Sequence, residues 1–203
     1  MKSQLPRKTV YRLSLYSRCL ERTEAKTISS ETLAQLAGVK PTQLRKDLAY
    51  CGHAGKRGLG YDVVLLRALL AETLGTSRLQ PVVLVGTGHL GLALLRYREG
   101  FDKEGFEIAA AFDIKPMKTP PKGITVPIFP MTQIAHFVAD RGVRMAILCV
   151  PALAAQDVCN LLVTCGIQAI LNFAPIILQT PPQVAVNDVN LAIELENLSY
   201  FIQ

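Results

Sequence analysis

The chain has 203 residues, enough for one ordinary domain or two small ones, and half of them are hydrophobic. No apolar run reaches the ~18 residues that a membrane span needs, and no apolar run follows the three cations among the first ten residues, so we expect a cytoplasmic protein without a signal peptide. The five cysteines form no C-x-x-C pair, which argues against a disulfide framework and against a metal site and favours buried thiols over redox-active ones.

The positive charge is confined to the first third of the chain. Residues 1–60 contain 12 Lys and Arg against 4 Asp and Glu, a net charge of +8, whereas residues 61–78 are balanced at two of each sign. Residues 79–203 contain 8 cations against 10 anions, a net charge of −2. This asymmetry is typical of a nucleic-acid-binding head on a neutral body. We place the boundary at 78/79, after the Gly75-Thr76-Ser77 segment.

The head has the pattern of a helix-turn-helix. Residues 7–24 have apolar side chains at helical spacing, and Ser29 or Ser30 then caps a short second helix that Gly38 ends in a tight turn. Pro41 suits the first position of a third helix that runs to about Tyr50. The apolar residues that we expect to face inward in the first helix are Val10, Leu13, Tyr16 and Leu20.

The third helix has one inner and one outer face. Leu44 and Leu48 are four residues apart and face inward, whereas Thr42, Arg45, Lys46 and Ala49 fall on another face. Two adjacent outward cations suit a helix that lies in the DNA major groove. A generic amphipathic helix has a similar pattern, so this feature alone does not show that the helix binds DNA.

A glycine-rich segment follows the third helix. Residues 52–61 contain four glycines around Lys56 and Arg57, which predicts a two-stranded wing with a basic tip suited to the minor groove. A plain solvated hairpin is the alternative. Residues 62–74 then resume helical spacing and complete the head.

The second part opens with a dinucleotide-binding pattern. The strand at residues 81–85 leads into Gly86-Thr87-Gly88-His89-Leu90-Gly91 and a helix over residues 92–97. A second strand, residues 108–112, ends at Asp113, 22 residues after Gly91, close to the ~20 expected for an acid that binds the adenine ribose. Asp113 would repel a 2′-phosphate and favours NAD(H), a preference that Lys115 softens.

The alternation of strands and helices continues to the end of the chain. We expect strands at residues 125–129, 145–150, 169–173 and 184–186 and a helix at residues 152–165. Val150, Pro151 and Asn172 then lie at strand ends that line the dinucleotide crevice. A final helix within residues 187–203 has leucines at helical spacing, which fits a dimerisation helix and equally a helix that caps the domain.

Catalysis is the less favoured interpretation of the Rossmann pattern. A dehydrogenase needs a substrate domain and an acid–base residue, yet the ~125 residues after the head are used by the nucleotide fold. His53 falls in the wing, His89 in the glycine loop and His136 in a helix away from the strand ends. An NAD-dependent oxidoreductase and a CoA- or nucleotide-binding subunit stay open as alternatives, but the second does not explain the +8 head.

These motifs together resemble the redox-sensing transcriptional repressor family Rex over nearly the whole chain. The resemblance rests on residues 45–48, 55–61 and 85–91, and on residues 111–113, 171–175 and 194–200. It implies a winged helix over residues 1–78, a Rossmann NAD(H) domain over residues 79–186 and a C-terminal helix over residues 187–203 that is swapped between the subunits of a homodimer. It also implies binding to a palindromic DNA operator when NADH is low, and release when NADH binds.

The pattern and the resemblance give the following expected site residues. For the dinucleotide they are Gly86, Thr87, Gly88, His89, Leu90, Gly91, Tyr97, Asp113, Ile114, Lys115, Val150, Pro151 and Asn172. For DNA they are Lys40, Thr42, Gln43, Arg45, Lys46, Lys56, Arg57, Gly58 and Tyr61. For the switch between the two ligands they are Arg18, Tyr97, Asp188 and Asn190.

Three positions depart from the family pattern. Lys40 stands where a capping Thr is frequent, which removes a cap worth about 1 kcal/mol and adds a charge that can bind phosphate. Cys51 and His53-Ala54 change the entrance to the wing. Asn190 stands where the family has an Asp that pairs with the positions of Arg18 and Tyr97, and Asp188 is two residues away.

Overall fold

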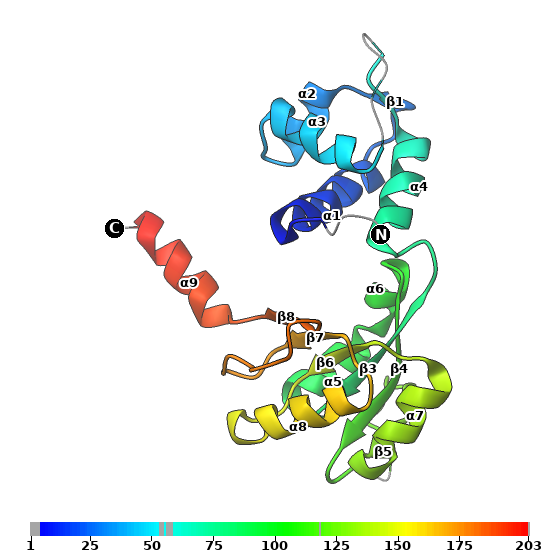
Figure 1. Ribbon diagram of the computed structural model, residues 1–203, viewed down its shortest axis with the longest axis vertical. Coiled ribbons are helices and arrows are strands. Elements are labelled where there is room, and N and C mark those ends of the chain that lie inside the picture. Colours follow the sequence, from blue (N-terminus) through cyan, green and yellow to red (C-terminus); the bar gives the residue numbers. More distant parts are fainter. Residues whose placement is uncertain (1–4, 53–54, 56–58, 118, 203) are drawn as a thin grey trace. The chain divides into compact units, whose positions relative to one another are not determined.

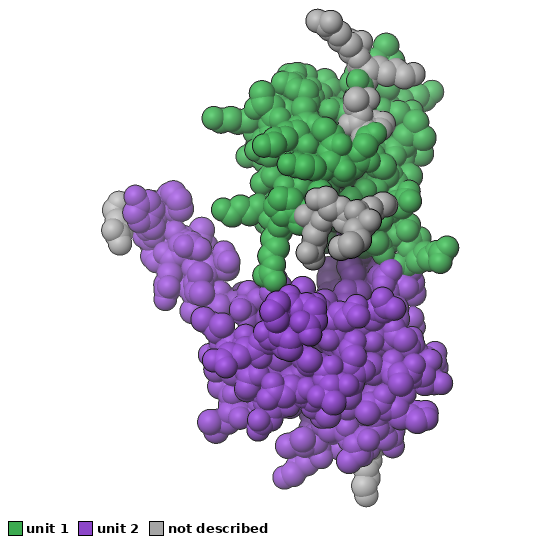
Figure 2. All heavy atoms as spheres, in the orientation of Figure 1, with its two compact units in different colours: residues 1–78 green, residues 79–203 purple. Residues whose placement is uncertain are grey.

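The structure, a computed structural model, describes residues 5–52, 55, 59–117 and 119–202. The chain forms two compact units, residues 1–78 and 79–203 (Figure 2). Each unit has its own hydrophobic core.

The described residues of the first unit form four helices and a small sheet (Figure 1). The helices are α1 (Arg7–Glu21), α2 (Ser30–Leu36), α3 (Pro41–Tyr50) and α4 (Val63–Leu74), and strand β1 (Thr27–Ile28) pairs antiparallel with β2 (Tyr61–Asp62). Ser29 caps α2 by accepting a hydrogen bond from the Thr32 amide, and Pro41 begins α3. The predicted helix-turn-helix is therefore present.

Helix α1 differs from its prediction in length and in register. It ends at Glu21 rather than near residue 24, and the Thr23 hydroxyl donates to the carbonyl of Cys19 in its last turn. Val10 is 39 % exposed, and Thr9 is buried in its place. The Thr9 hydroxyl lies 3.4 Å from the buried Asp47 carboxylate, so this position of α1 faces the core.

Only part of the predicted wing lies within the described residues. Tyr61–Asp62 does form a strand, and it pairs antiparallel with Thr27–Ile28. The predicted tip, Lys56-Arg57-Gly58, lies outside the described residues.

The second unit is a parallel six-stranded sheet with strand order β5-β4-β3-β6-β7-β8. This is the order of a Rossmann fold, in which the strand order reverses between β3 and β6, the first and fourth strands of this sheet in chain order. The strands are β3 (Gln80–Val85), β4 (Phe106–Asp113), β5 (Ile128–Pro130), β6 (Met145–Leu148), β7 (Ala169–Asn172) and β8 (Ala185–Asp188).

Helices cover both faces of this sheet. Side chains of α7 (Ile134–Arg141) and α8 (Ala152–Thr164) pack with Val83, Val85 and Phe112 on one face, and α5 (His89–Arg96) and α6 (Arg98–Lys103) pack with Val82 and Leu84 on the other. Successive β3 residues therefore serve opposite faces, as expected for a strand that is buried on both sides. The unit also contains α9 (Leu191–Ser199) and the 3₁₀ turns η1 (Met131–Gln133) and η2 (Tyr200–Ile202).

Several predicted boundaries shift. Helix α5 begins at His89 and not at Leu92, α6 was not predicted, and β6 ends two residues early, at Leu148. The strand expected at residues 125–129 is found at Ile128–Pro130. The amide of Ala111 donates to the carbonyl of Pro127, so pairing with β4 begins only there, and the buried Val126 before it packs in irregular chain.

We predict that Gly91→Ala destabilises the second unit. A methyl group on Gly91 would overlap the carbonyl of Gly86 and stand 3.3 Å from Leu84 Cδ2, and backbone cannot yield as a side chain can. Overpacking of this kind costs roughly 1–3 kcal/mol. Urea unfolding followed by circular dichroism measures the loss.

Gly88→Ala is the matched control for this experiment. A methyl group on Gly88 would meet nothing within 4 Å, and its φ of −68° suits any residue. Equal unfolding midpoints for the two variants would contradict the packing argument.

Candidate functional site

The glycine loop after β3 is built around a close approach of two backbone segments. Gly86 has a φ of +97°, and a methyl group there would lie 2.5 Å from the carbonyl oxygen of Cys149. Its amide donates to the carbonyl of Phe112 at 2.8 Å. Gly86 thus makes the turn and Gly91 allows α5 to pack on the strand, as their positions in the motif predict.

The loop delivers the start of α5 to the carboxyl edge of the sheet. Gly88 is the N-cap residue of α5 and has open space where a side chain would be. The first amides of a helix carry a partial positive charge and bind phosphate groups. Thr87 is buried, whereas His89 and Leu90 are exposed in the first turn.

Asp113 ties the loop to the end of β4. Its Oδ2 accepts hydrogen bonds from the amide (2.7 Å) and the hydroxyl (2.8 Å) of Thr87, and its Oδ1 accepts from the amide of Lys115 (2.9 Å). Burial alone would raise the pKa of this carboxyl, but the backbone donors Lys115 and Thr87 lower it below its usual range. Asp113 is therefore a carboxylate at neutral pH, and Ile114 and Lys115 beside it are exposed.

The other predicted crevice residues lie at the same edge of the sheet, but Asn172 has a structural task. Val150 is half-buried and Pro151 is exposed at the N-cap of α8. The Asn172 side chain is buried, and its amide nitrogen donates to the carbonyls of Ala174 and Ile176 and to Asp188 Oδ1. It shapes the chain after β7 rather than offering a free donor to a ligand.

Tyr97 lies at the far end of α5 from the glycine loop. It is the C-cap residue of this eight-residue helix, about 13.5 Å of helical rise from Gly88. Its ring is 65 % exposed, packs edge-on against Phe101 at 5.5 Å, and covers the Cα of Gly100.

The outward face of α3 carries the expected cations. Thr42, Arg45 and Lys46 are exposed, and Leu44 and Leu48 are fully buried beneath them. Arg45 Nη1 donates to Ser30 Oγ at 2.9 Å and to Glu31 Oε1 at 3.1 Å, which orients the guanidinium from α2. Lys40 is exposed at the N-cap of α3, where its side chain makes no capping bond to the described residues.

Two residues expected at the DNA surface are used inside the head instead. Tyr61 is only 4 % exposed and packs in the core with Ile28 and Val63, so its ring cannot reach DNA. Gln43 is half-buried, and its amide nitrogen donates to Asp47 Oδ1 at 2.9 Å. Alternation of polar and apolar residues could not reveal either position, because both depend on partners from other elements.

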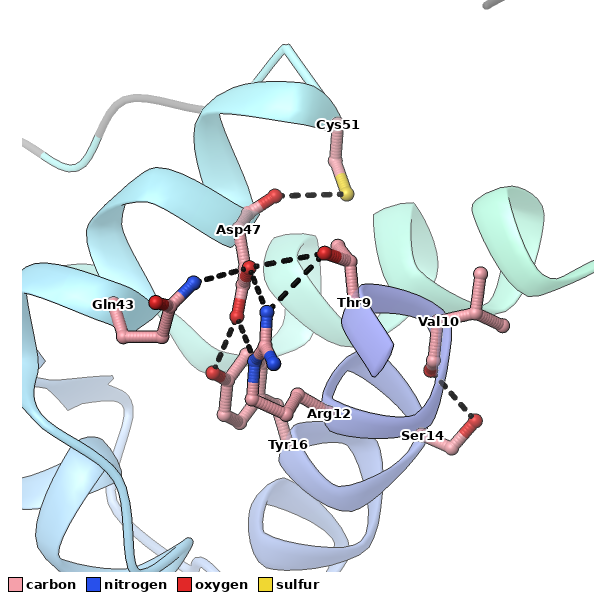
Figure 3. A network of polar contacts seen from close by, with 8 residues as sticks. All are labelled: Thr9, Val10, Arg12, Ser14, Tyr16, Gln43, Asp47 and Cys51. Atoms are coloured by element: carbon pink, nitrogen blue, oxygen red, sulfur yellow. Dashed lines mark hydrogen bonds and ion pairs between the residues drawn. The ribbon is translucent and has the colours of Figure 1, made fainter. Parts of the chain in front are cut away.

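A buried polar network centred on Asp47, which the apolar pattern does not predict, joins α1 and α3 (Figure 3). The Asp47 side chain is fully buried and accepts hydrogen bonds from Arg12 Nε (2.6 Å), Arg12 Nη2 (2.7 Å) and the Tyr16 hydroxyl (2.8 Å), besides Gln43. The Thr9 hydroxyl lies 3.4 Å from the same carboxylate. Thr9, Arg12 and Tyr16 are spaced as one stripe of α1, a signal that the apolar pattern hid.

The ionisation of this network is settled by its contacts. Burial would raise the pKa of Asp47, but the hydrogen bonds from Arg12, Tyr16 and Gln43 lower it below the usual range. The bond to Asp47 raises the pKa of Arg12, and burial followed by the bond to Asp47 raises the pKa of Tyr16. An ionised carboxylate and guanidinium with a neutral phenol follow at neutral pH.

The last part of the chain is exposed throughout. Every described residue of α9 and η2 is exposed, including Leu191, Leu195 and Leu198. Asn190 caps α9 by accepting from the Ala192 amide at 3.0 Å, and Asp188 is held by Asn172. Arg18 lies in the last turn of α1.

The remaining reactive groups offer little chemistry. The cysteines are free, and burial raises the pKa of the Cys149 thiol to about 12. Over the described ranges, no three His, Cys, Asp or Glu side chains gather as metal ligands would, and no helix has the length and apolar character of a membrane span. His136 is exposed on α7.

Known protein families match both units of the chain. Residues 4–49 match the family described as "Putative DNA-binding protein N-terminus", and residues 77–176 match "CoA binding domain". A redox-sensing transcriptional repressor Rex from Desulforamulus reducens is 42 % identical over 200 residues, which covers 97 % of this chain and 95 % of that protein.

Two solved structures of RSP, a Rex-family repressor, have the same fold as this chain. RSP in complex with beta-NAD+ and operator DNA is 34 % identical, covers 98 % of this chain and 93 % of its own, and has a TM-score of 0.89. RSP in complex with beta-NADH is 33 % identical, covers 98 % and 95 %, and has a TM-score of 0.85.

We predict that acid removes the stabilising effect of Asp47. Because folding lowers its pKa, Asp47 contributes stability that is present above its unfolded value, about 4, and is lost as the pH falls through the folded value. The difference in unfolding midpoint between the wild type and Asp47→Asn should therefore shrink below pH ~4. Glu31→Gln, which breaks an exposed pair, is the control.

Thermal melting of the full chain, followed by far-ultraviolet circular dichroism at a series of pH values, measures this difference. A gap between the wild type and Asp47→Asn that stays constant from neutral to acidic pH would count against an ionised Asp47 in the folded protein.

Proposed function

Since the chain belongs to the Rex family of redox-sensing transcriptional repressors, we propose that its head binds a palindromic DNA operator and that NADH in the Rossmann unit releases it. The observation that carries this proposal is the joint presence of a cationic recognition helix and an intact dinucleotide loop in one chain. The relatives are repressors and not enzymes, which confirms the prediction that this chain is not a catalyst.

The residues at the carboxyl edge of the sheet fit NAD(H). The open space over Gly88 leaves room for a pyrophosphate beside the first amides of α5. Asp113 is ionised and has acceptor capacity for ribose hydroxyls, since each carboxylate oxygen can accept more than one hydrogen bond. Asn172 shapes the proposed site by fixing the chain that follows β7. The residues that line the site are Thr87, His89, Leu90, Ile114, Lys115, Val150 and Pro151.

NADH and NAD⁺ differ in the charge and shape of the nicotinamide ring. A ligand shifts a conformational equilibrium only through its different affinity for the two states. For NADH to release the operator, it must therefore favour the released geometry by about 2 kcal/mol or more. We propose that Arg18, Tyr97, Asp188 and Asn190 transmit this preference, with Asp188 as the carboxylate because Asn190 carries no charge.

The proposed DNA interface is centred on α3. Arg45 and Lys46 face outward next to each other, and Lys40 and Thr42 extend the same surface toward the start of the helix. Lys56, Arg57 and Gly58 would contribute the wing. We leave Tyr61 out of this interface because it is buried, and we assign Gln43 mainly to the support of Asp47.

We propose that the protein acts as a homodimer in the cytoplasm, where the chromosome is accessible. The exposed apolar residues of α9 and η2 support a second copy as their cover: Leu191, Ile193, Leu195, Leu198, Tyr200, Phe201 and Ile202. Exchange of this helix between two subunits would bury them, and the two-fold symmetry of a dimer matches a palindromic operator.

The decisive experiment titrates dinucleotides into the protein–operator complex. A duplex palindrome is first recovered by selection with the full-length protein from a randomised pool. NADH should release it at micromolar concentration, whereas NAD⁺ should leave it bound at the same salt concentration, which must be fixed because phosphate contacts are salt-dependent. Fluorescence anisotropy of the labelled duplex measures release.

Other outcomes of this titration would redirect the assignment. Binding that neither dinucleotide changes would mean that the two units are uncoupled. Failure to select any duplex would sink the repressor function and favour a nucleotide-binding subunit.

We further predict that Lys46→Ala weakens binding to the selected palindrome by about 1–3 kcal/mol if Lys46 reads a base edge. The matched control is Lys122→Ala, which removes one exposed lysine from the other unit, away from the proposed dinucleotide site, and should leave DNA affinity unchanged. An equal loss in both variants would indicate that overall charge alone governs binding.

A further inference from the structure

Asp47 follows directly after the two cations that α3 presents to solvent, yet its own side chain is fully buried. It therefore cannot touch DNA. The head nevertheless directs at this one carboxylate four hydrogen bonds of 2.6–2.9 Å, three of them from α1 (Figure 3).

These contacts are directional in a way that the apolar contacts of α3 are not. The side chains of Leu44 and Leu48 are fully buried, but apolar packing tolerates small rotations of a helix about its axis. The two parallel N–H bonds from Arg12 to Asp47 fix both distance and angle, because a guanidinium matches a carboxylate in one geometry. The Tyr16 hydroxyl adds a third fixed direction from the same helix.

We propose that Asp47 is a positioning residue for operator recognition: its clamp to Arg12 and Tyr16 sets the rotation of α3 on α1, and so decides where Arg45 and Lys46 point in the major groove. This inference rests on the proposed DNA-binding function. It gives Asp47 a role in sequence specificity without any contact to a base.

The clamp should affect specific and non-specific binding differently. Contacts to base edges need accurate placement, because each side chain must meet a defined donor and acceptor pattern. Contacts to phosphates tolerate displacement and depend mainly on the number of cations. A rotated α3 would therefore lose the operator and keep its general affinity for DNA.

Arg12→Lys and Tyr16→Phe test the clamp with the smallest changes. Arg12→Lys keeps the positive charge but removes the two-pronged geometry, and Tyr16→Phe removes one hydrogen bond at nearly constant volume. Asp47→Asn removes the charge itself. Ser14→Ala is the matched control, because the Ser14 hydroxyl donates to the carbonyl of Val10 on the exposed side of α1, away from Asp47.

Each full-length variant is titrated with the palindrome selected by the wild type and with a scrambled duplex of equal length and composition, well below its melting temperature. We expect Arg12→Lys and Asp47→Asn to weaken palindrome binding at least about tenfold, while binding to the scrambled duplex changes less than about twofold. Tyr16→Phe should give a smaller loss in the same direction, and Ser14→Ala none. NADH affinity should be unchanged in all four.

Three results would overturn the proposal. Palindrome binding that is unchanged in Arg12→Lys and Asp47→Asn would show that the clamp does not place α3. Parallel loss on both duplexes would show a purely structural role. A wild type that selects no palindrome would refute the proposed function and this inference with it, whereas a wild type that selects one while the variants match it refutes this inference alone.

Discussion

Removing the Asp47 carboxylate from water costs several kcal/mol unless donors replace the lost hydration, and this constraint shapes the whole head. The donors must come from outside the turn of α3 that carries Asp47, because the backbone amides there are used within the helix. Arg12 and Tyr16 supply three hydrogen bonds from α1, and Gln43 supplies one from the preceding turn of α3. The orientation of α1 against α3 is thus dictated by one side chain, and the apolar core closes around it.

The second unit applies the same chemistry with a different degree of exposure. Asp113 also holds a functional loop, through the amide and hydroxyl of Thr87, but it lies at an open edge of the sheet and is half-buried. A carboxylate in this position can support the glycine loop and still receive ligand hydroxyls. Asp47 is enclosed and can only position its neighbours. Burial therefore separates a carboxylate that is open to a ligand from one that is closed to it.

Local signals explain what could be predicted from the sequence. Ser29, Pro41 and the glycines of the loop act through their own backbone or the adjacent turn. The helix-turn-helix and the β3–α5–β4 segment of the Rossmann fold could therefore be predicted from the sequence. The Asp47 network was not, because Arg12 and Asp47 are 35 residues apart in the chain. The same contact explains why Thr9 is buried and Val10 exposed, against the apolar pattern of α1.

Two further predicted site residues have structural partners that the sequence did not indicate. Tyr61 belongs to a glycine-rich basic segment, which suggested a DNA contact, but its pairing with Ile28 turns the ring into the core. Asn172 follows a buried strand, as ligand-binding residues often do, yet the carbonyls of Ala174 and Ile176 and the carboxylate of Asp188 use its amide. In each case the partner that decides the role lies in another element.

The exposed C-terminal segment connects these local constraints to assembly. Asp188 is fixed to the nucleotide edge through Asn172, and three residues later the chain begins a helix whose apolar side chains meet solvent. A surface of this kind is stable in water only when another apolar surface covers it. If a second copy provides that cover, Asp188 stands where the dinucleotide site and the subunit interface meet. A change at the nicotinamide could then reach the partner through Asn172 and Asp188, the last residues of β7 and β8.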